Sequence, residues 1–234
     1  MALLCFGATV AGPGHLRDGL PNQDAWGHAR AAGGQVVVVA DGLGSRPHAA
    51  TGARAACRAV PEAVRVWSRH EGASMDVLLG LVHLLWRARL GSVEPDTAAT
   101  TCLFTFVRND GSGLVAQLGD GLILLGEGDQ VESLQARAPD AFSNTTRALG
   151  VTRSVGAWAT RPLDARDRTL VLCTDGVSDD LLPDRYSELL RWLDTEFAAR
   201  PPGPRRRALA SALSAWPTPN HLDDKTLALI RTHP

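Results

Sequence analysis

The chain has 234 residues, of which 44% are hydrophobic and 21% charged, a composition typical of a globular protein with a sizeable core. With a formal net charge of −1, the chain lacks the excess of basic residues found in many proteins that bind nucleic acid or anionic membranes. No stretch approaches the roughly 20 apolar residues that a membrane-spanning helix needs. We therefore expect one domain over residues 1–234, with no nucleic-acid or membrane partner.

The first apolar stretch, at 3–10, is predicted to be a strand. It lacks the basic residues that begin a secretory signal, and its apolar run is short. None of the four cysteines has the C-x-x-C spacing of a structural zinc site. Three of them lie in apolar strand-like or helical segments, which is typical of a reduced protein, so we expect a cytoplasmic location.

The next elements alternate between strand and helical patterns. The valines of 35–40 predict a strand that is buried on both faces. Apolar residues then recur at helical spacing over 47–70, where Pro61 is expected to break or kink the helix. A second helix is predicted at 74–90, with Ser74 as its N-cap.

The second half of the chain repeats this order of strands followed by helices. Strands are predicted at 99–107, 114–118, 121–126 and 169–174. Two helices follow at 183–197 and 205–216, with a loop at "RPPGP" between them, and the last strand is at 226–231. This order predicts an α+β fold on an antiparallel sheet, because a doubly wound sheet would show strict strand–helix alternation.

Aspartates stand at the ends of several predicted strands, where an unpaired carboxylate is costly to bury. They are Asp24 in the loop after the first strand, Asp41 after the valine strand, Asp120, Asp175 with Asp179 four residues later, and Asp223 with Asp224 before the last strand. A single Asp-Gly pair is usually a turn, but three of them, at 41–42, 120–121 and 175–176, follow apolar strands. We expect these carboxylates to converge, and several converging carboxylates need a cation.

Oxygen ligands of this kind suit Mg²⁺ or Mn²⁺ and do not suit zinc. Two adjacent divalent ions lower the pKa of a bridging water and hold the oxygens of a phosphoryl group. The residue types alone therefore indicate a metal-dependent hydrolase.

Seven short motifs occur in the order seen in type 2C (PPM-type) metal-dependent protein serine/threonine phosphatases. They are "NQDA", "VVADGLGS", "TTCLFTFV", "LGDG", "RALG", "CTDGVSDDL" and "DDKT", between residues 22 and 226. The chain resembles this family over nearly its whole length, and its "GHLRDGLPNQDA" segment resembles a compact bacterial branch. The resemblance implies a central antiparallel β-sandwich flanked by helices on both sides, with a two-metal site at one end.

The activity implied by the resemblance is hydrolysis of phosphoserine and phosphothreonine in proteins. A hydroxide that bridges two Mn²⁺ or Mg²⁺ ions would attack the phosphorus, and some members hold a third ion. The implied partners are phosphorylated proteins and a serine/threonine kinase that acts in the opposite direction. No phosphoenzyme is expected, because Cys173, the obvious alternative nucleophile, has the context of a buried packing residue.

The resemblance also assigns roles to the aspartates. Asp41 would bridge the two ions, and the main-chain carbonyl of Gly42 would bind one of them. Asp175 and Asp223 would hold the other ion, while Asp24 would orient metal-bound waters. The third ion would be held by Asp120, Asp175 and Asp179.

The sequence departs from the family pattern where the substrate phosphate is held. Gly19 stands at the position of the arginine that binds phosphate in many members, so Arg17 and His15 are the candidates for that role. Leu43 replaces a histidine that has been assigned as general acid in animal relatives. The segment 127–168 is expected to contain the flap that edges the active site.

Two alternatives stay open at this point. The missing arginine at position 19 favours a pseudophosphatase that binds phosphoproteins as a regulatory module. The intact set of Asp41, Asp175 and Asp223 argues against it, because a scaffold has no need for three converging charges. The other alternative is a hydrolase of small phosphate esters.

Overall fold

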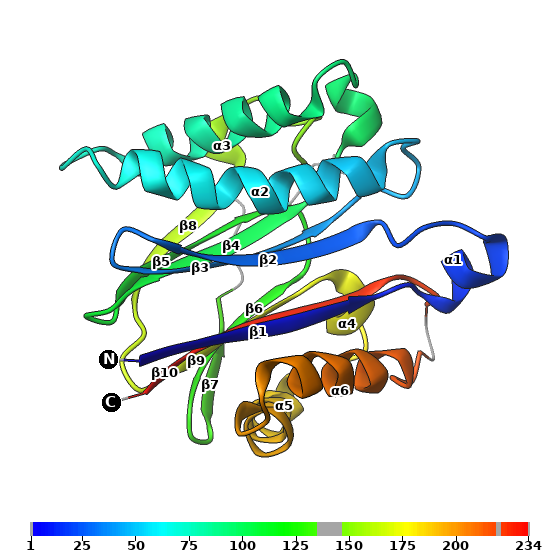
Figure 1. Cartoon of the computed structure of the whole chain (residues 1–234), viewed down its shortest axis with the longest axis vertical. Coiled ribbons are helices and arrows are strands. Elements are labelled where there is room, and N and C mark those ends of the chain that lie inside the picture. The colour runs from blue at the N-terminus through cyan, green and yellow to red at the C-terminus, as the bar shows by residue number, and fades with distance from the viewer. Residues whose placement is uncertain (1, 135–146, 219–220, 234) are drawn as a thin grey trace.

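The computed structural model describes residues 2–134, 147–218 and 221–233. In this part of the chain two antiparallel sheets lie face to face, and helices cover the outer side of each (Figure 1). The first sheet has the order β1-β10-β9-β6-β7, with β1 (Ala2–Val10), β6 (Leu122–Glu127), β7 (Gln130–Ser133), β9 (Thr169–Cys173) and β10 (Lys225–His233). The second has the order β2-β3-β4-β5-β8, with β2 (Asp24–Ala31), β3 (Gly34–Asp41), β4 (Cys102–Arg108), β5 (Ser112–Leu118) and β8 (Ala159–Asp164).

Helices pack on the outer face of each sheet, so the predicted α+β sandwich is confirmed. The second sheet is covered by α2 (Ala49–Trp67) and α3 (Met75–Leu90), and the first by α5 (Tyr186–Leu193) and α6 (Pro202–Ser214). Shorter elements connect these parts: α1 (Pro13–Asp18), α4 (Asp175–Ser178), the 3₁₀ turns Pro95–Ala98, Val155–Ala157 and Pro183–Arg185, and the π turn Asp194–Ala198. Within the described ranges no helix is both long and apolar enough to cross a bilayer.

The valine run of β3 explains how the layers hold together. Val37 and Val39 pack in the core between the two sheets, whereas Val36 and Val38 pack under the outer helices. All four side chains are fully buried, and each contributes about 1.5–3 kcal/mol relative to an exposed position. The strand is therefore apolar on both faces, and Asp41 is the first polar residue at its end.

The structure corrects the sequence predictions about secondary structure at three points. α2 is not broken at Pro61, because the helix is buried against the sheet on both sides of the proline and this packing outweighs one lost hydrogen bond. α6 begins at Pro202 inside the predicted loop, since a helix's first turn does not need the proline N–H. Asp24 begins β2 and does not lie in a loop.

Candidate metal centre

The centre is built first from the paired ends of β2 and β3. Asp24 and Asp41 are register partners across these antiparallel strands. The backbone of Asp41 is fixed from the other side by Thr101: the Asp41 N–H donates to the Thr101 hydroxyl at 3.0 Å, and the Thr101 N–H donates to the Asp41 carbonyl at 2.7 Å. The N–H of Gly42 donates to the carbonyl of Gln23 at 3.2 Å, so the chain after β3 stays beside the start of β2.

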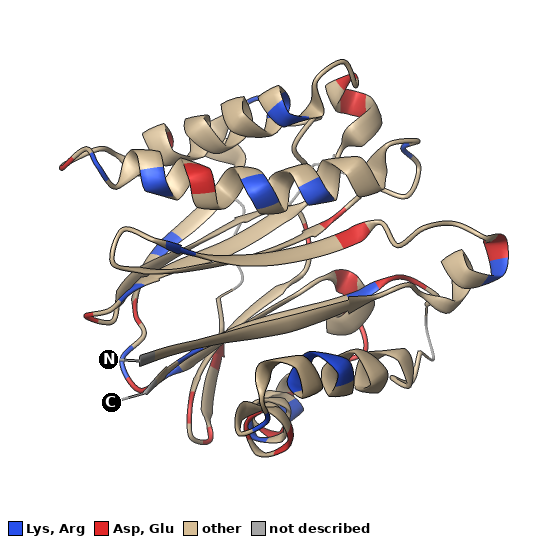
Figure 2. Cartoon of the chain, in the orientation of Figure 1, with Lys and Arg blue, Asp and Glu red and all other residues tan. Residues whose placement is uncertain are grey.

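The other sheet and its connections supply the remaining carboxylates. Asp175 follows β9 and begins α4, and Asp120 lies in the turn between β5 and β6. One carboxylate oxygen each from Asp41, Asp120 and Asp175 lie within 4.8 Å of one another. Figure 2 shows that acidic segments of both sheets gather at the α4 end of the sandwich.

The close approach of α4 to the segment before β10 depends on Gly176. A Cβ atom at this position would lie 1.8 Å from the carbonyl oxygen of Asp224. The glycine therefore lets Asp175 approach Asp223; burial, then the charge of Asp120 and then that of Asp223 raise the pKa of Asp175. Asp223 has the same effect on the pKa of Asp41, so it lies near both carboxylates although it is outside the tight group of three.

Asp179 lies at the edge of this group. Its N–H donates to the carbonyl of Asp175 at 2.9 Å at the end of α4, and its side chain is exposed. Its charge also raises the pKa of Asp175, although less than burial and the charges of Asp120 and Asp223 do. The structure thus brings the sequence-predicted carboxylates to one end of the sandwich.

The electrostatics of the centre call for a cation. Burial, and after it the neighbouring charges of Asp24 and Asp175, raise the pKa of Asp41 to about 11. Burial raises the pKa of Asp24 to about 7, and burial together with Asp120 raises that of Asp175 to about 6. Full ionisation at neutral pH requires positive charge in their midst. Because the donors of Asp41, Asp120 and Asp175 are all oxygens, this set fits a hard divalent ion such as Mg²⁺ or Mn²⁺.

Sequence reasoning missed Thr174 and gave Asp224, although it was among the strand-end aspartates, no role of its own. Thr174 is buried, and its hydroxyl donates to Oδ2 of Asp24 at 2.8 Å and accepts the N–H of Thr226 at 3.1 Å. Asp224 is also buried and accepts hydrogen bonds from the N–H groups of Gly12 and Gln23. The repeated Asp in "DDKT" was the available signal for Asp224, whereas nothing local marks Thr174.

The two candidates for phosphate binding have different surroundings. Arg17 lies on α1 with an exposed side chain, and its Nε donates to Oδ1 of Asp18 at 2.8 Å. His15 lies on the same helix with its Nδ1 2.9 Å from Oδ2 of Asp224. A ring nitrogen of His15 lies within 4.8 Å of a carboxylate oxygen of Asp223. Of the two, His15 is therefore the one whose described contacts belong to the centre.

Cys173 is fully buried, as expected for a packing residue, and burial raises the pKa of its thiol to about 12. A thiol in this state is not a nucleophile at neutral pH. The cysteine therefore offers no competing chemistry two residues before Asp175.

The predicted flap is described only in part, because residues 135–146 lie outside the described ranges. Where its description resumes, Leu149 exchanges backbone hydrogen bonds with Thr100 at 2.8 and 3.1 Å. Thr100 in turn forms a bridge with Gly42, and its hydroxyl donates to the carbonyl of Asp41 at 2.8 Å. The middle of the predicted flap segment is therefore tied directly to the loop that carries Asp41.

The chain matches a known protein family and is similar in fold to several solved structures. A family profile described as "Protein phosphatase 2C" matches residues 11–214. A search of curated proteins returned no match. Among solved structures, the chain is similar to a variant of a bacterial serine phosphatase, with a TM-score of 0.71, 16% identity and complete coverage of both chains.

Two further solved structures share the fold at low sequence identity. The serine/threonine phosphatase of S. agalactiae has a TM-score of 0.70 and 14% identity, with 99% of this chain and 100% of that chain covered. PppA, a key regulatory component of the T6SS in Pseudomonas aeruginosa, has a TM-score of 0.67 and 19% identity, with 99% and 98% covered.

Proposed function

The chain belongs to the protein phosphatase 2C family, and on this premise we propose that it hydrolyses phosphoserine and phosphothreonine in proteins with two bound Mn²⁺ or Mg²⁺ ions. The observation that carries the proposal is the convergence of Asp41, Asp120 and Asp175, from separate parts of both sheets, within 4.8 Å. Bound there, two divalent ions would lower the pKa of a water and so supply the nucleophile for in-line attack on phosphorus.

Each carboxylate has a defined task in this proposal. Asp41 and the main-chain carbonyl of Gly42 would hold one ion, and Asp175 and Asp223 would hold the other, with Asp41 contributing to both. Asp24, fixed by the hydroxyl of Thr174 at 2.8 Å, orients the attacking water.

The weaker third site is proposed to use Asp120 and Asp179 together with Asp175. Asp120 lies in the tight group of three, and Asp179 lies at the end of α4; both side chains are exposed. A site with two exposed ligands is expected to hold its ion less tightly than the site built on the half-buried Asp41.

Residues 1–234 are proposed to act as one phosphatase domain, with 127–168 as the flap beside the centre. Phosphorylated proteins are the proposed substrates, and a serine/threonine kinase is the proposed source of the phosphate groups. The backbone pairing of Leu149 with Thr100 supports this placement, since it couples the flap segment to the Asp41 loop.

Binding without turnover remains the alternative function, and it is favoured by one observation. The guanidinium of Arg17 is exposed and engaged with Asp18, so no arginine contact with the centre is described for this helix. Calorimetric titration with Mn²⁺ followed by turnover of p-nitrophenyl phosphate separates the two functions. Mn²⁺ binding with turnover supports the enzyme, and binding of Mn²⁺ and phosphopeptide without turnover supports the pseudophosphatase.

The assignment of the carboxylates is tested by substitution. Asp41→Asn and Asp175→Asn are expected to lose about 100-fold or more in Mn²⁺-dependent turnover, because each removes a charged ligand. Asp76→Asn is the matched control, since Asp76 is an exposed carboxylate in the first turn of the outer helix α3. Full activity in both centre variants would discard the mechanism. A series of phosphopeptides and small phosphate esters then distinguishes a protein phosphatase from a metabolite hydrolase.

A further inference from the structure

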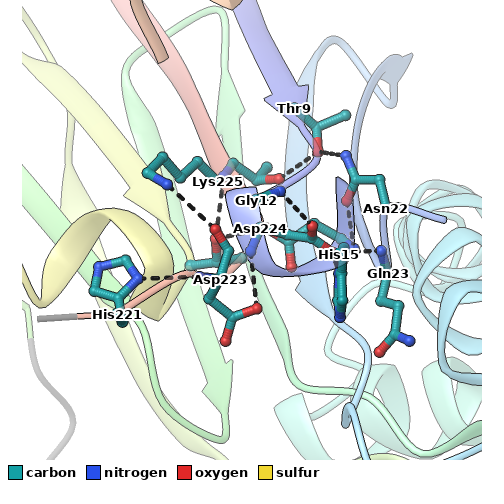
Figure 3. Close-up of polar contacts among 12 residues, drawn as sticks. Thr9, Gly12, His15, Asn22, Gln23, His221, Asp223, Asp224 and Lys225 are labelled. Carbon is teal, nitrogen blue, oxygen red and sulfur yellow. Dashed lines mark hydrogen bonds and ion pairs between the residues drawn. The ribbon is translucent and has the colours of Figure 1, made fainter. Parts of the chain in front are cut away.

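One buried carboxylate gathers three segments at the edge of the centre. Asp224 is 2% exposed. Its Oδ1 accepts the N–H of Gly12 at 2.7 Å, and its Oδ2 accepts the N–H of Gln23 at 2.6 Å. Nδ1 of His15 lies 2.9 Å from the same Oδ2 (Figure 3). Charge-assisted hydrogen bonds to a buried carboxylate are among the stronger polar contacts in proteins, so this arrangement is well fixed.

The position of Asp224 joins the two sheets at the centre. Asp224 immediately precedes β10 of the first sheet, whereas Gln23 immediately precedes Asp24 and β2 of the second. The N–H of Asp224 also donates to Oδ1 of Asp223 at 2.8 Å. The carboxylate of Asp224 therefore fixes Gln23, the residue before Asp24, and the N–H of Asp224 fixes the side chain of Asp223.

The segment around Gly12 is built for this contact. A Cβ atom at Gly12 would lie 2.1 Å from the carbonyl oxygen of Asp223. Only glycine lets the backbone come close enough for its N–H to reach Asp224, and α1 starts at the next residue. His15 is thus brought to Asp224 by a turn whose geometry excludes other side chains.

The carboxylate of Asp224 also lies against the imidazole of His15. Nδ1 of the ring is buried, forms no hydrogen bond among the described residues, and has Oδ2 of Asp224 2.9 Å away as an ion-pair partner. A carboxylate at Nδ1 sets the orientation of the ring and leaves Nε2 for another partner. Figure 3 shows the ring of His15 and the carboxylate of Asp223 extending to the same side of Asp224. The side chain of His15 is 18% exposed, so part of the ring is open to a ligand.

We propose that Asp224 is a positioning residue, which orients His15 so that Nε2 of the imidazole binds an oxygen of the substrate phosphate at the edge of the centre. This inference rests on the proposed phosphatase function and extends it to a pair of residues. His15 makes the contact with the oxyanion, and the effect of Asp224 on phosphate binding passes through His15.

The first test measures the affinity of the Mn²⁺-loaded protein for inorganic phosphate by calorimetry. His15→Ala and Asp224→Asn are each expected to weaken this affinity about tenfold, the value of one charge-assisted hydrogen bond. His15→Gln, whose amide nitrogen can take the place of Nε2, is expected to stay within about threefold of the unmodified chain. His70→Gln is the matched control, since His70 is exposed beyond the end of α2.

Coupling between the two residues distinguishes positioning from a separate structural role. The double variant Asp224→Asn/His15→Ala is expected to bind phosphate no more weakly than His15→Ala alone. In turnover of a phosphopeptide, both single variants should raise KM about tenfold while kcat stays within about threefold, because a contact made equally in ground and transition states changes only KM. Additive losses in the double variant, of about 100-fold, would overturn the proposal.

A spectroscopic measurement keeps the inference testable without turnover. In ¹⁵N NMR of the histidine rings, neutral His15 is expected to carry its proton on Nδ1, facing Asp224. In Asp224→Asn the amide NH₂ can face Nδ1, which moves the proton to Nε2. An unchanged His15 tautomer in a folded Asp224→Asn variant would overturn the proposal.

If Asp224→Asn does not fold, the phosphate affinities of His15→Ala and His15→Gln test the proposal. Equal phosphate affinity in these two variants would overturn it. Turnover by the unmodified chain with unchanged phosphate affinity in His15→Ala would refute this inference alone. Phosphate binding that depends on His15, without turnover of any substrate, would support the inference and refute the proposed activity.

Discussion

The hydroxyl of Thr174 donates to Oδ2 of Asp24 at 2.8 Å, and this single contact joins the end of one sheet to the start of the other. Thr174 follows β9 in the first sheet, and Asp24 begins β2 in the second. Because Asp24 is the register partner of Asp41, the contact also fixes the central carboxylate relative to Asp175. The two-sheet architecture thus serves the centre by bringing carboxylates from both sheets to one end.

Thr174→Val is expected to lower the free energy of unfolding by about 1–3 kcal/mol, because it removes the hydroxyl that bonds Oδ2 of the buried Asp24 and the N–H of Thr226. Thr174→Ser keeps the hydroxyl and is expected to stay within about 1 kcal/mol of the unmodified chain. Urea unfolding and Mn²⁺-dependent turnover measure the two effects. A valine variant as stable and active as the serine variant would show that the contact is dispensable.

The stability of the metal-free protein is expected to fall as the pH rises from about 4 to about 7. In the folded chain the pKa values of Asp175 and Asp24 are raised to about 6 and about 7, whereas both are near 3.8 when unfolded. Between these values the folded state holds more protons than the unfolded state, so raising the pH favours unfolding.

Thermal unfolding in the presence of a chelator measures this dependence, with a Tm about 5 °C lower at pH 7.5 than at pH 5. Mn²⁺ is expected to raise Tm more at pH 7.5 than at pH 5, because ionised carboxylates bind the ion better. A metal-free Tm that rises over this range would contradict the assigned clustering of charges.

Gly176→Ala is expected to destabilise the chain by about 3 kcal/mol and to weaken Mn²⁺ binding at least tenfold. The added Cβ would lie 1.8 Å from the carbonyl oxygen of Asp224, so α4 has to move and take Asp175 with it. Gly80→Ala is the control: Gly80 lies inside α3 with no atom within 4 Å of the added Cβ, and alanine there should stabilise by about 0.5–1 kcal/mol. Normal Mn²⁺ affinity in Gly176→Ala would refute the close-approach argument.

Asp18→Ala tests whether Arg17 contributes to phosphate binding. The substitution frees the guanidinium, and the loss of this fully exposed pair should leave the stability of the chain nearly unchanged. If Arg17 serves the substrate, KM for a phosphopeptide should fall about twofold in Asp18→Ala and rise in Arg17→Ala. Unchanged KM in both variants would make the prediction for Arg17 wrong and leave His15 as the phosphate contact.

The sandwich was predictable because its inner strands are apolar on both faces and end abruptly in Asp-Gly. β3 and β9 are recognisable from composition alone, since a strand buried on both faces has no polar alternation. The edge strand β8 was missed because most of its residues are exposed and include Pro162. β2 was missed because Gly27 and His28 interrupt its apolar pattern, which also put Asp24 wrongly in a loop.

The carboxylates of the centre could be predicted because Asp at the end of an apolar strand is unusual, and because their motifs occur in a known order. The hydrogen bonds that position these carboxylates could not be predicted from the sequence. Thr174 and Asp224 act across 150 and 201 residues of sequence separation, on Asp24 and Gln23 respectively. Such partners are set by the register of β10 and the path of the chain before α1, which no local pattern encodes.

The central claim is that carboxylates from both sheets share a pair of divalent ions, and diffraction from crystals grown with Mn²⁺ tests it most directly. Data collected at the manganese absorption edge should show two anomalous peaks on either side of the Asp41 carboxylate. Oxygens of Asp175 and Asp223 should lie about 2.0–2.2 Å from one of them. A map with no peak beside Asp41, at a manganese concentration that supports turnover, would contradict the account.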